Sequence, residues 1–406
     1  MDLYAGTPYW LVKNSLWNYF NPLRDNIKTK VAVVGAGITG ALVAHELLEA
    51  GIDCCLVDRR SPATGSSCAS TALLQYEIDI PLCRMAEIMR EQDAVTAYRS
   101  CLESIADLQV LFKEAAVDAD FKNVPSVFYA SNRKGLELIE KEYEIRRKHD
   151  LPVEFLDAAR LHKVIGIDAL GALRNTVSAQ IDTYKAATGL MKRDMRERGL
   201  RIYSHTEVSE FKSRSGGYTL TTKNGKRIKC DYVVIASGFE AGEFLPRKLM
   251  NLTSTFAIIS QPVDKRGLWT ERSLIWETRQ PYLYIRTDSS NRIIVGGGDM
   301  PINGGVLRRF MLPHKAGMLE KRFRELFPQI PFITEMKWAG TFSSTRDGLP
   351  IIGAFKAEPR KLFALGYGGN GITFSLISAQ IIAKTAQGKK DPRARIFSPE
   401  RESLHK

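Results

Sequence analysis

Apolar and polar positions along the first 60 residues follow a pattern that predicts a strand, a helix and a second strand. Residues 31–34 (VAVV) form a short apolar run of mainly β-branched residues, which is typical of a strand buried on both faces. Residues 41–50 are rich in good helix formers, and Gly51 is well placed to end that helix. A second apolar run, 54–57, stops at Asp58. The pattern therefore predicts a βαβ unit.

The rest of the chain alternates between the helical period and the strand period. Apolar residues at helical spacing predict helices, and short apolar runs bounded by glycine or asparagine turns predict strands and hairpins. In chain order, the expected elements are helices within 84–115, a strand at 126–130, helices at 134–149 and 184–198, strands within 201–236 joined by turns at 216–217 and 224–225, a hairpin at 282–299 with its turn at 288–291, a strand at 362–365 and a helix at 372–386.

The loop between the first strand and helix carries the chemistry of a dinucleotide site. Gly35, Gly37 and Gly40 fit the pattern G-x-G-x-x-G, which allows a tight turn, close backbone approach to a pyrophosphate and close helix packing. The helix N-terminus offers free N–H groups to phosphate. Asp58, 23 residues after Gly35, suits a carboxylate that accepts from ribose hydroxyls and repels a 2′-phosphate. The neighbouring pair Arg59-Arg60 either lies along the cofactor or faces water.

A second G-x-G-x-x-G, at Gly366, Gly368 and Gly371, lacks the context that makes the first one informative. A strand precedes it and a helix follows, but no further apolar strand or acidic residue completes a βαβ unit. We therefore interpret it as a glycine loop that directs a helix N-terminus toward an electron-rich group.

Composition narrows the class of protein further. The net charge of +13 comes from dispersed basic residues without interleaved aromatics, so nucleic-acid binding is not expected, and attraction of an anionic substrate or an acidic partner is the simpler reading. No apolar run of 18 residues and no secretion signal are seen. The six cysteines show no metal-ligand spacing, so no metal is expected and a reduced, cytoplasmic setting fits best.

Four stretches together resemble the D-amino-acid-oxidase-like (DAO) family of FAD-dependent oxidoreductases, which includes glycine oxidase and sarcosine oxidase. They are VAVVGAGITG with Asp58, TGSSCASTALL, CDYVVIASG, and DGLPIIG followed by LFALGYGGNGITFS. The resemblance covers nearly the whole chain from residue 30. It implies an α/β fold, with a Rossmann-like FAD-binding domain and an inserted antiparallel-sheet substrate domain whose sheet covers the flavin. It also implies FAD rather than NAD.

The resemblance assigns the cofactor residues by motif. The front loop would hold the pyrophosphate, Asp58 the ribose, the 66–71 loop the middle of FAD, and the 366–373 loop the flavin N1/C2=O edge. The cofactor-binding residues expected are Gly35, Ala36, Gly37, Ile38, Thr39, Gly40, Asp58, Arg59, Arg60, Ser66, Ser67, Ala69, Ser70, Thr71, Glu207, Val208, Ser237, Gly238, Gly340, Gly366, Gly368, Gly369, Asn370, Gly371, Ile372 and Thr373.

Four departures from the family pattern bear on the reaction. Phe342 stands where glycine-oxidase-like members carry an arginine for the substrate carboxylate, and Ile294 stands where sarcosine-oxidase-like members carry an oxygen-activating lysine. The second difference favours a dehydrogenase with another electron acceptor. Gly340 and Ala69 stand where other members attach flavin covalently through cysteine or histidine, so we expect non-covalent FAD.

Substrate contacts are expected from a small polar and aromatic set. Tyr284 and Arg286 lie on the predicted hairpin, where 282 and 284 share one face of a strand, and Arg346 is an alternative to Arg286. His162 and His205 are expected to be structural. The predicted substrate residues are Tyr284, Arg286, Gln75, Tyr76 and Tyr367.

The resemblance divides the chain between two domains. The expected order is an N-terminal extension (1–27), FAD-binding pieces (28–90, 160–245 and 335–390), substrate-domain pieces (91–159 and 246–334) and a C-terminal tail (391–406). The expected reaction is oxidation of the C–N bond of an amine or amino acid by hydride transfer to flavin N5, with O2 or another acceptor. The alternatives are an FAD-dependent 2-hydroxy-acid dehydrogenase, a non-catalytic flavin-holding subunit and an NAD-dependent dehydrogenase. The oligomeric state and the role of the extension are not determined by the sequence.

Overall fold

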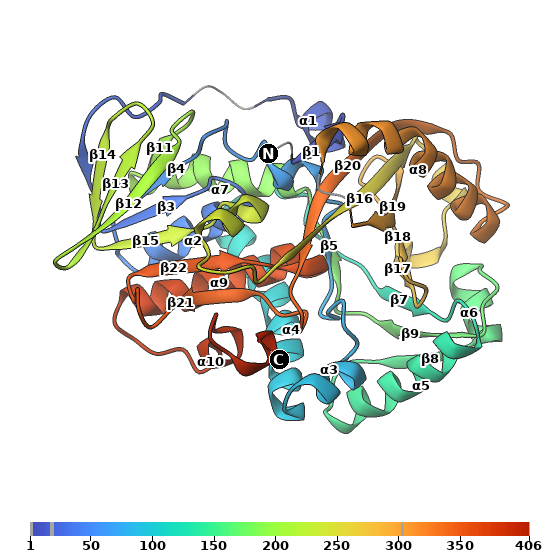
Figure 1. Ribbon diagram of the computed structural model, residues 1–406. Coiled ribbons are helices and arrows are strands. Elements are labelled where there is room, and N and C mark those ends of the chain that lie inside the picture. Colours follow the sequence, from blue (N-terminus) through green and yellow to red (C-terminus); the bar gives the residue numbers. More distant parts are fainter. Residues whose placement is uncertain (1–2, 17–19, 302–303, 406) are drawn as a thin grey trace.

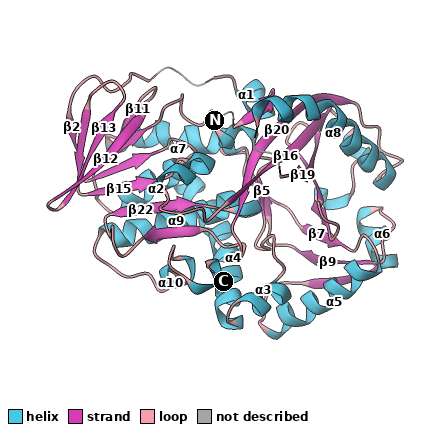
Figure 2. Cartoon of the chain, in the orientation of Figure 1, coloured by secondary structure: helices cyan, strands magenta, loops and turns pink. Residues whose placement is uncertain are grey.

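Two large β-sheets divide the molecule, as the computed structural model shows for residues 3–16, 20–301 and 304–405. In Figure 1 a six-stranded sheet lies on the left and a nine-stranded sheet on the right. Figure 2 shows both helices and strands on each side of the molecule, so the fold is α/β, as predicted. Among the helices of these described residues, none is both long and apolar enough to cross a membrane.

The six-stranded sheet is the predicted dinucleotide-binding unit. Its first five strands are parallel and the sixth runs antiparallel at the edge. The strands in spatial order are β11 (Arg201–Tyr203), β4 (Cys54–Val57), β3 (Val31–Val34), β15 (Tyr232–Ile235), β22 (Lys361–Leu365) and β21 (Ile351–Ala354). The chain order reverses between β3 and β15. Ligands of such sheets bind at this switch point, outside the carboxyl ends of the strands.

Helices cover this sheet and carry most of its core. Helix α2 (Ile38–Glu49) packs along α9 (Gly371–Ala386), and the hydroxyls of Thr39 and Ser375 meet at 2.8 Å between them. The long α4 (Glu91–Glu114) packs on α9 as well, through Ser104, whose hydroxyl donates to the carbonyl of Thr373. The predicted helices at 84–115, 134–149, 184–198 and 372–386 are confirmed. The other α-helices are α1 (Tyr9–Asn14), α3 (Leu82–Ile88), α5 (Arg133–Lys148), α6 (Ala158–Ile165), α7 (Thr183–Arg198), α8 (Gly305–Leu326) and α10 (Ala394–Phe397).

The nine-stranded sheet is the predicted second sheet, with one difference. All neighbouring strands are antiparallel except β7 and β17, which run parallel, so the sheet is mixed. Parallel strands need a long connection, and β7 and β17 come from segments far apart in the chain. In spatial order the strands are β1 (Tyr4–Gly6), β20 (Thr334–Ser344), β16 (Asn251–Ser260), β19 (Ile293–Met300), β18 (Leu283–Thr287), β17 (Leu274–Glu277), β7 (Ser126–Tyr129), β9 (Gly171–Asn175) and β8 (Glu154–Asp157).

Two small sheets complete the described architecture. The predicted turns at 216–217 and 224–225 join three antiparallel strands, to which a fourth adds in parallel. The strands of this sheet are β12 (Val208–Arg214), β13 (Gly217–Thr222), β14 (Arg227–Cys230) and β2 (Ile27–Lys28). The other small sheet has three strands, β5 (Leu73–Leu74), β10 (Ala179–Gln180) and β6 (Lys122–Asn123).

Sheet membership places several segments differently from the predicted domain boundaries. Helix α4 contributes to the core that packs against the six-stranded sheet, although the prediction places 91–159 in the substrate domain. Strand β20 and the segment 160–175 belong to the nine-stranded side, although the prediction places both in the FAD-binding domain. The N-terminal extension is not separate, because β1 pairs with β20. The reason is long-range pairing, which local pattern does not encode.

Candidate active site

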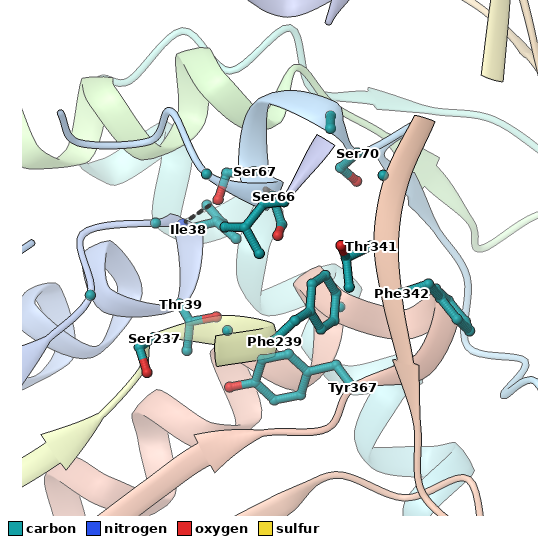
Figure 3. A pocket seen from close by; sticks show the side chains of 18 of the residues that line it. Ile38, Thr39, Ser66, Ser67, Ser70, Ser237, Phe239, Thr341, Phe342 and Tyr367 are labelled. Carbon is teal, nitrogen blue, oxygen red and sulfur yellow. Dashed lines mark hydrogen bonds between the residues drawn. The ribbon is translucent and has the colours of Figure 1, made fainter. Parts of the chain in front are cut away.

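A cavity of about 500 Å³ runs from the carboxyl ends of the parallel strands to the inner face of the nine-stranded sheet. Its wall contains the front glycine loop, the 65–73 segment, the 206–209 segment, the 236–240 turn and the 366–372 loop. Residues of the β18–β19 hairpin and of β20 close its inner end. Figure 3 looks into it, with Ile38 and Ser67 on one side and Phe239 and Tyr367 on the other.

The front glycines are required by close backbone approaches. Gly35 has φ +114°, and a Cβ at this position would overlap the carbonyl of Ala236 at the end of β15. A Cβ at Gly40 would overlap the carbonyl oxygen of Gly35 itself. The glycines thus hold the loop against the switch point. Ala36 and Gly40 support the turn from behind and do not line the cavity, whereas Gly35, Gly37, Ile38 and Thr39 do.

Asp58 occupies the end of β4 and fixes the same loop. One of its oxygens accepts from the N–H of Ala36 at 2.7 Å and the other from the N–H of Arg60 at 2.7 Å. Burial raises the pKa of this carboxyl, and the two N–H donors and the neighbouring arginines oppose that rise. Its carboxylate therefore lines the cavity beside the first turn, where it would accept hydrogen bonds from a ribose of a bound dinucleotide.

The outer end of the cavity carries its basic lining residues. Arg60 makes a bidentate pair with Glu240 at 2.8 Å for both contacts, and Arg59 contacts the same carboxylate. Both arginines line the cavity, but their charges are engaged with Glu240 rather than free. Four other predicted residues line the same end: Glu207, Val208, Ser237 and Gly238.

The 66–71 loop wraps the middle of the cavity. The hydroxyl of Ser67 accepts from the N–H of Ile38 at 2.9 Å, which ties the loop to the start of α2 (Figure 3). The hydroxyls of Ser66 and Ser237 are buried and have no hydrogen-bond partner among the described residues. Unpaired buried hydroxyls are costly, so two of them in the lining of one cavity indicate a polar ligand. The remaining predicted residues of this wall, Ala69, Ser70, Thr71 and Gly340, also line the cavity.

The 366–373 loop forms the floor before α9. The side chain of Asn370 donates to the carbonyls of Gln75 and Glu77, both at 2.9 Å, so it joins the floor to the opposite wall. The lining set includes Gly366, Gly368, Gly369, Asn370, Gly371 and Ile372. Thr373 lies one turn into α9 and donates to the carbonyl of Asn370, outside the lining.

The inner end combines aromatic rings with two carboxylates. Asp79 accepts from the N–H of Gly369 at 2.7 Å and from the hydroxyl of Tyr282 at 3.1 Å. The rings of Tyr282 and Tyr284 lie 5.8 Å apart. Asp299, on β19, shares this space, and burial raises its pKa to about 6, with Asp79 adding to the rise. This end is thus a partly apolar chamber with acidic groups.

Three of the five predicted substrate residues line the cavity and two do not. Gln75, Tyr284 and Tyr367 are in its wall. Arg286 is directed under the 71–72 segment, where its guanidinium donates to the carbonyls of Thr71, Ala72 and Ile181. Tyr76 is fully buried on the other side of its segment. Its hydroxyl donates to the carbonyl of Pro152 at 2.7 Å.

The other arginine and the two histidines considered from the sequence lie outside the cavity. Arg346 is exposed and does not line it. Neither His162 nor His205 lines it. The wall residues that the sequence prediction missed include Asp79, Thr255, Trp276 and Asp299, which come from separate strands and segments and carry no local motif.

The residues present fit a dinucleotide cofactor. The glycine cradle, the buried carboxylate at the end of the second strand and the orphaned hydroxyls of Ser66 and Ser237 line one continuous space. A parallel sheet with this switch point, facing a second sheet across the cavity, is typical of two-domain proteins that bind a dinucleotide.

The chain belongs to the FAD dependent oxidoreductase (DAO) family, whose sequence profile matches residues 30–385. It is 23% identical over 394 residues to gamma-glutamylputrescine oxidoreductase of Escherichia coli K12, covering 94% of this chain and 88% of that one. It is 25% identical over 382 residues to glycine oxidase of Geobacillus kaustophilus, covering 89% and 93%. Its fold is similar to the glycine oxidase structure from Geobacillus kaustophilus (TM-score 0.75, 22% identity, 92% and 99% covered). The chain is therefore an FAD-dependent oxidoreductase.

Proposed function

We propose that this enzyme oxidises the C–N bond of an amine or amino acid, with the substrate bound in the inner chamber of the cavity. The observation that carries the proposal is the continuity of one cavity, from the dinucleotide loop at Gly35 to the chamber of Tyr282, Tyr284, Asp79 and Asp299. Bound FAD supplies a two-electron acceptor for the hydride on the carbon that bears nitrogen, which leaves an imine that water hydrolyses.

The chain's own residues position both molecules. The front loop, Asp58 and the 66–71 loop would hold the nucleotide and the pyrophosphate, and the 366–372 loop would face the flavin with the N-terminus of α9. Tyr284, Gln75 and Tyr367 are the proposed substrate contacts. The nine-stranded sheet above them limits access of water, because β16, β18 and β19 are largely buried.

We propose that FAD is held without a covalent bond. None of the six cysteines lines the cavity, and the thiol of Cys68, the one nearest the loop in sequence, points to the carbonyl of Gly65 at 3.0 Å. The test is acid precipitation of the purified protein, after which the yellow colour should remain in the supernatant. Colour retained by the precipitate would contradict this part of the proposal.

The electron acceptor is proposed to be a molecule other than O2. Ile294 occupies the position at which the sarcosine-oxidase-like members carry lysine, and it is buried in β19. The lysine among the described lining residues is Lys223, which lies at the outer end beside Glu207. All six cysteines are free thiols, which supports a reducing, cytoplasmic location.

The deciding experiment is anaerobic reduction of the holoenzyme. Amines and amino acids should bleach the flavin band near ~450 nm, whereas 2-hydroxy acids should not. Slow return of the band in air and fast return with an artificial acceptor would support a dehydrogenase. Bleaching only by hydroxy acids would favour the 2-hydroxy-acid alternative, and a flavin that no substrate reduces would favour a flavin-holding subunit.

A further inference from the structure

The inner chamber holds two carboxylates that come from opposite parts of the chain. Asp79 follows β5 on one wall and Asp299 lies on β19 in the other. The hydroxyl of Tyr282 donates to Asp79, and both carboxylates raise the pKa of Tyr282, which burial raises most strongly. The hydroxyl of Tyr284 lies 3.1 Å from that of Thr255 beside Asp299.

The positive charges of the cavity wall are at the other end. Among the described lining residues, the basic ones are Arg59, Arg60 and Lys223. The first two pair with Glu240 and the third with Glu207. The inner chamber therefore has carboxylates without a cation among its described lining residues.

Three buried arginines near the chamber are engaged behind its wall and do not line it. Arg286 donates to backbone carbonyls, Arg308 to the hydroxyls of Ser254 and Thr341, and Arg146 to Glu77 and Glu142. Lys315 of α8 interacts electrostatically with Asp299, but its ammonium lies 5.6 Å from the ring of Phe256, outside the lining.

Two unpaired polar atoms show that this chamber is built to receive a polar ligand. Oδ1 of Asp299 is buried and has no hydrogen-bond partner among the described residues. The indole N–H of Trp276 is also unpaired there, although that side chain is only 7% exposed and lines the cavity. A buried acceptor and a buried donor without partners each destabilise the fold unless a ligand satisfies them.

We propose that Asp79 and Asp299 form an ammonium-binding subsite that selects amines without a carboxylate on the reacting carbon. This inference rests on the proposed function and narrows its substrate class from amines and amino acids to amines. A substrate cation gains attraction from both carboxylates in a chamber of low polarity. An α-carboxylate would face the same two groups and would meet no arginine among the described lining residues of the chamber, because Phe342 occupies the clamp position.

The test compares two probes of nearly identical shape and opposite charge. tert-Butylammonium and pivalate are added to the oxidised holoenzyme, and binding is measured from the visible spectrum of the flavin. Neither probe can be oxidised at its central carbon, because that carbon carries no hydrogen. tert-Butylammonium should perturb the spectrum saturably and pivalate should not. Equal or tighter binding of pivalate, or no response to either probe, would overturn the proposal.

Variants locate the effect at the two carboxylates. Asp299→Asn and Asp79→Asn should each weaken tert-butylammonium binding by at least about tenfold. Asp168→Asn makes the same change of net charge at an exposed side chain outside the cavity and should leave the affinity unchanged. Affinities within about twofold of the parent in both cavity variants would contradict the assignment.

A pH series on the parent enzyme tests the subsite without any substitution, so it does not depend on whether a variant folds. The groups facing Asp299 are Asp79, Tyr282, Tyr284, Thr255 and Lys315. Because the pKa of Asp299 is about 6, affinity for tert-butylammonium should fall as the pH drops from about 8 to about 5. An affinity independent of pH over this range would overturn the role of Asp299.

A failure of the proposed subsite can be distinguished from a failure of the proposed function. If neither amines nor amino acids reduce the flavin, the proposed function fails, while the binding contrast still reports the charge preference of the chamber. If amino acids reduce it faster than the corresponding amines, the reaction class stands and the subsite assignment fails.

Discussion

The indole N–H of Trp10 donates to the backbone carbonyl of Ser70 at 2.6 Å, which joins the N-terminal helix to the loop that wraps the middle of the cavity. Trp338 of β20 donates in the same way to the carbonyl of Ala69 at 2.9 Å. Two indoles from opposite ends of the chain thus hold consecutive peptides of the 66–71 loop. The N-terminal segment, to which the sequence assigns no role, therefore helps to shape the cofactor cavity.

Trp10→Phe should weaken FAD binding by about threefold to tenfold. The change removes a hydrogen bond worth about 0.5–1.5 kcal/mol while keeping an aromatic ring, so the loop loses one of its anchors. The affinity is measured by titrating the apoprotein with FAD. Trp269→Phe is the matched control, because its indole N–H donates to the carbonyl of Ser273 in the core of the nine-stranded side. Equal FAD affinity of the parent and Trp10→Phe would contradict the anchoring role.

Arg286→Met should lower stability without changing the KM for a reducing substrate by more than about threefold. Its guanidinium satisfies four backbone carbonyls, those of Thr71, Ala72, Ile181 and Thr287, and leaving buried acceptors unpaired costs about 1–3 kcal/mol each. Burial lowers the pKa of Arg286 to about 10, so it stays charged at neutral pH in the parent. Urea unfolding and steady-state kinetics check the two parts. A KM raised a hundredfold at unchanged stability would instead show direct substrate contact.

Gly40→Ala should abolish FAD binding or folding, because the added methyl group would overlap the carbonyl of Gly35 in the cofactor turn. Gly317→Ala is the matched control. Gly317 also lies within a helix, α8, but a methyl group there meets open space, so this change should stabilise by about 0.5–1 kcal/mol. The flavin content per chain and the melting temperature distinguish the two. A fully flavin-loaded, equally stable Gly40→Ala would contradict the close approach.

Arg401→Met should destabilise the protein by about 3–5 kcal/mol, as expected for breaking a buried ion pair. Arg401 holds Asp347 through contacts of 2.6 and 2.8 Å, so the 391–405 segment is docked on the loop before β21 and is not a free tail. Arg395→Met is the control, because its pair with Asp93 involves a largely exposed arginine side chain and contributes about 0–1 kcal/mol. Equal losses in both variants, measured by urea unfolding, would contradict this ranking.

The same pair predicts an acid-dependent loss of stability. Burial alone would raise the pKa of Asp347, but the hydrogen bonds and charge of Arg401 outweigh it and hold that pKa below its usual value. A depressed pKa in the folded state stabilises above the unfolded value of about 3.9, and this contribution is lost as the pH falls through the folded pKa. Below about pH 4 the difference in unfolding free energy between the parent and Arg401→Met should shrink. A difference that stays constant would contradict the linkage.

The cofactor half of this protein follows from local sequence. The βαβ unit, its glycines and Asp58 lie within 28 residues, and their roles follow from strand and helix periods that act over short separations. For the same reason the β18–β19 hairpin and most helices are predictable. The period of two places Tyr284 and Arg286 on one face of β18, and Tyr282 immediately precedes this strand. It does not show that Arg286, one step further along, lies beyond the chamber.

The substrate half depends on long-range pairing in the folded chain. Asp79 and Asp299 are separated by 220 residues, and Trp10 and Ser70 by 60, so no periodicity or spacing relates them. Their meeting depends on which strands of two sheets become neighbours and on their register, which is set by burial over the whole chain. The charge of the chamber follows from that pairing. Net charge suggests an anionic substrate, whereas the folded cavity presents carboxylates at its inner end because its basic lining residues are held at the other.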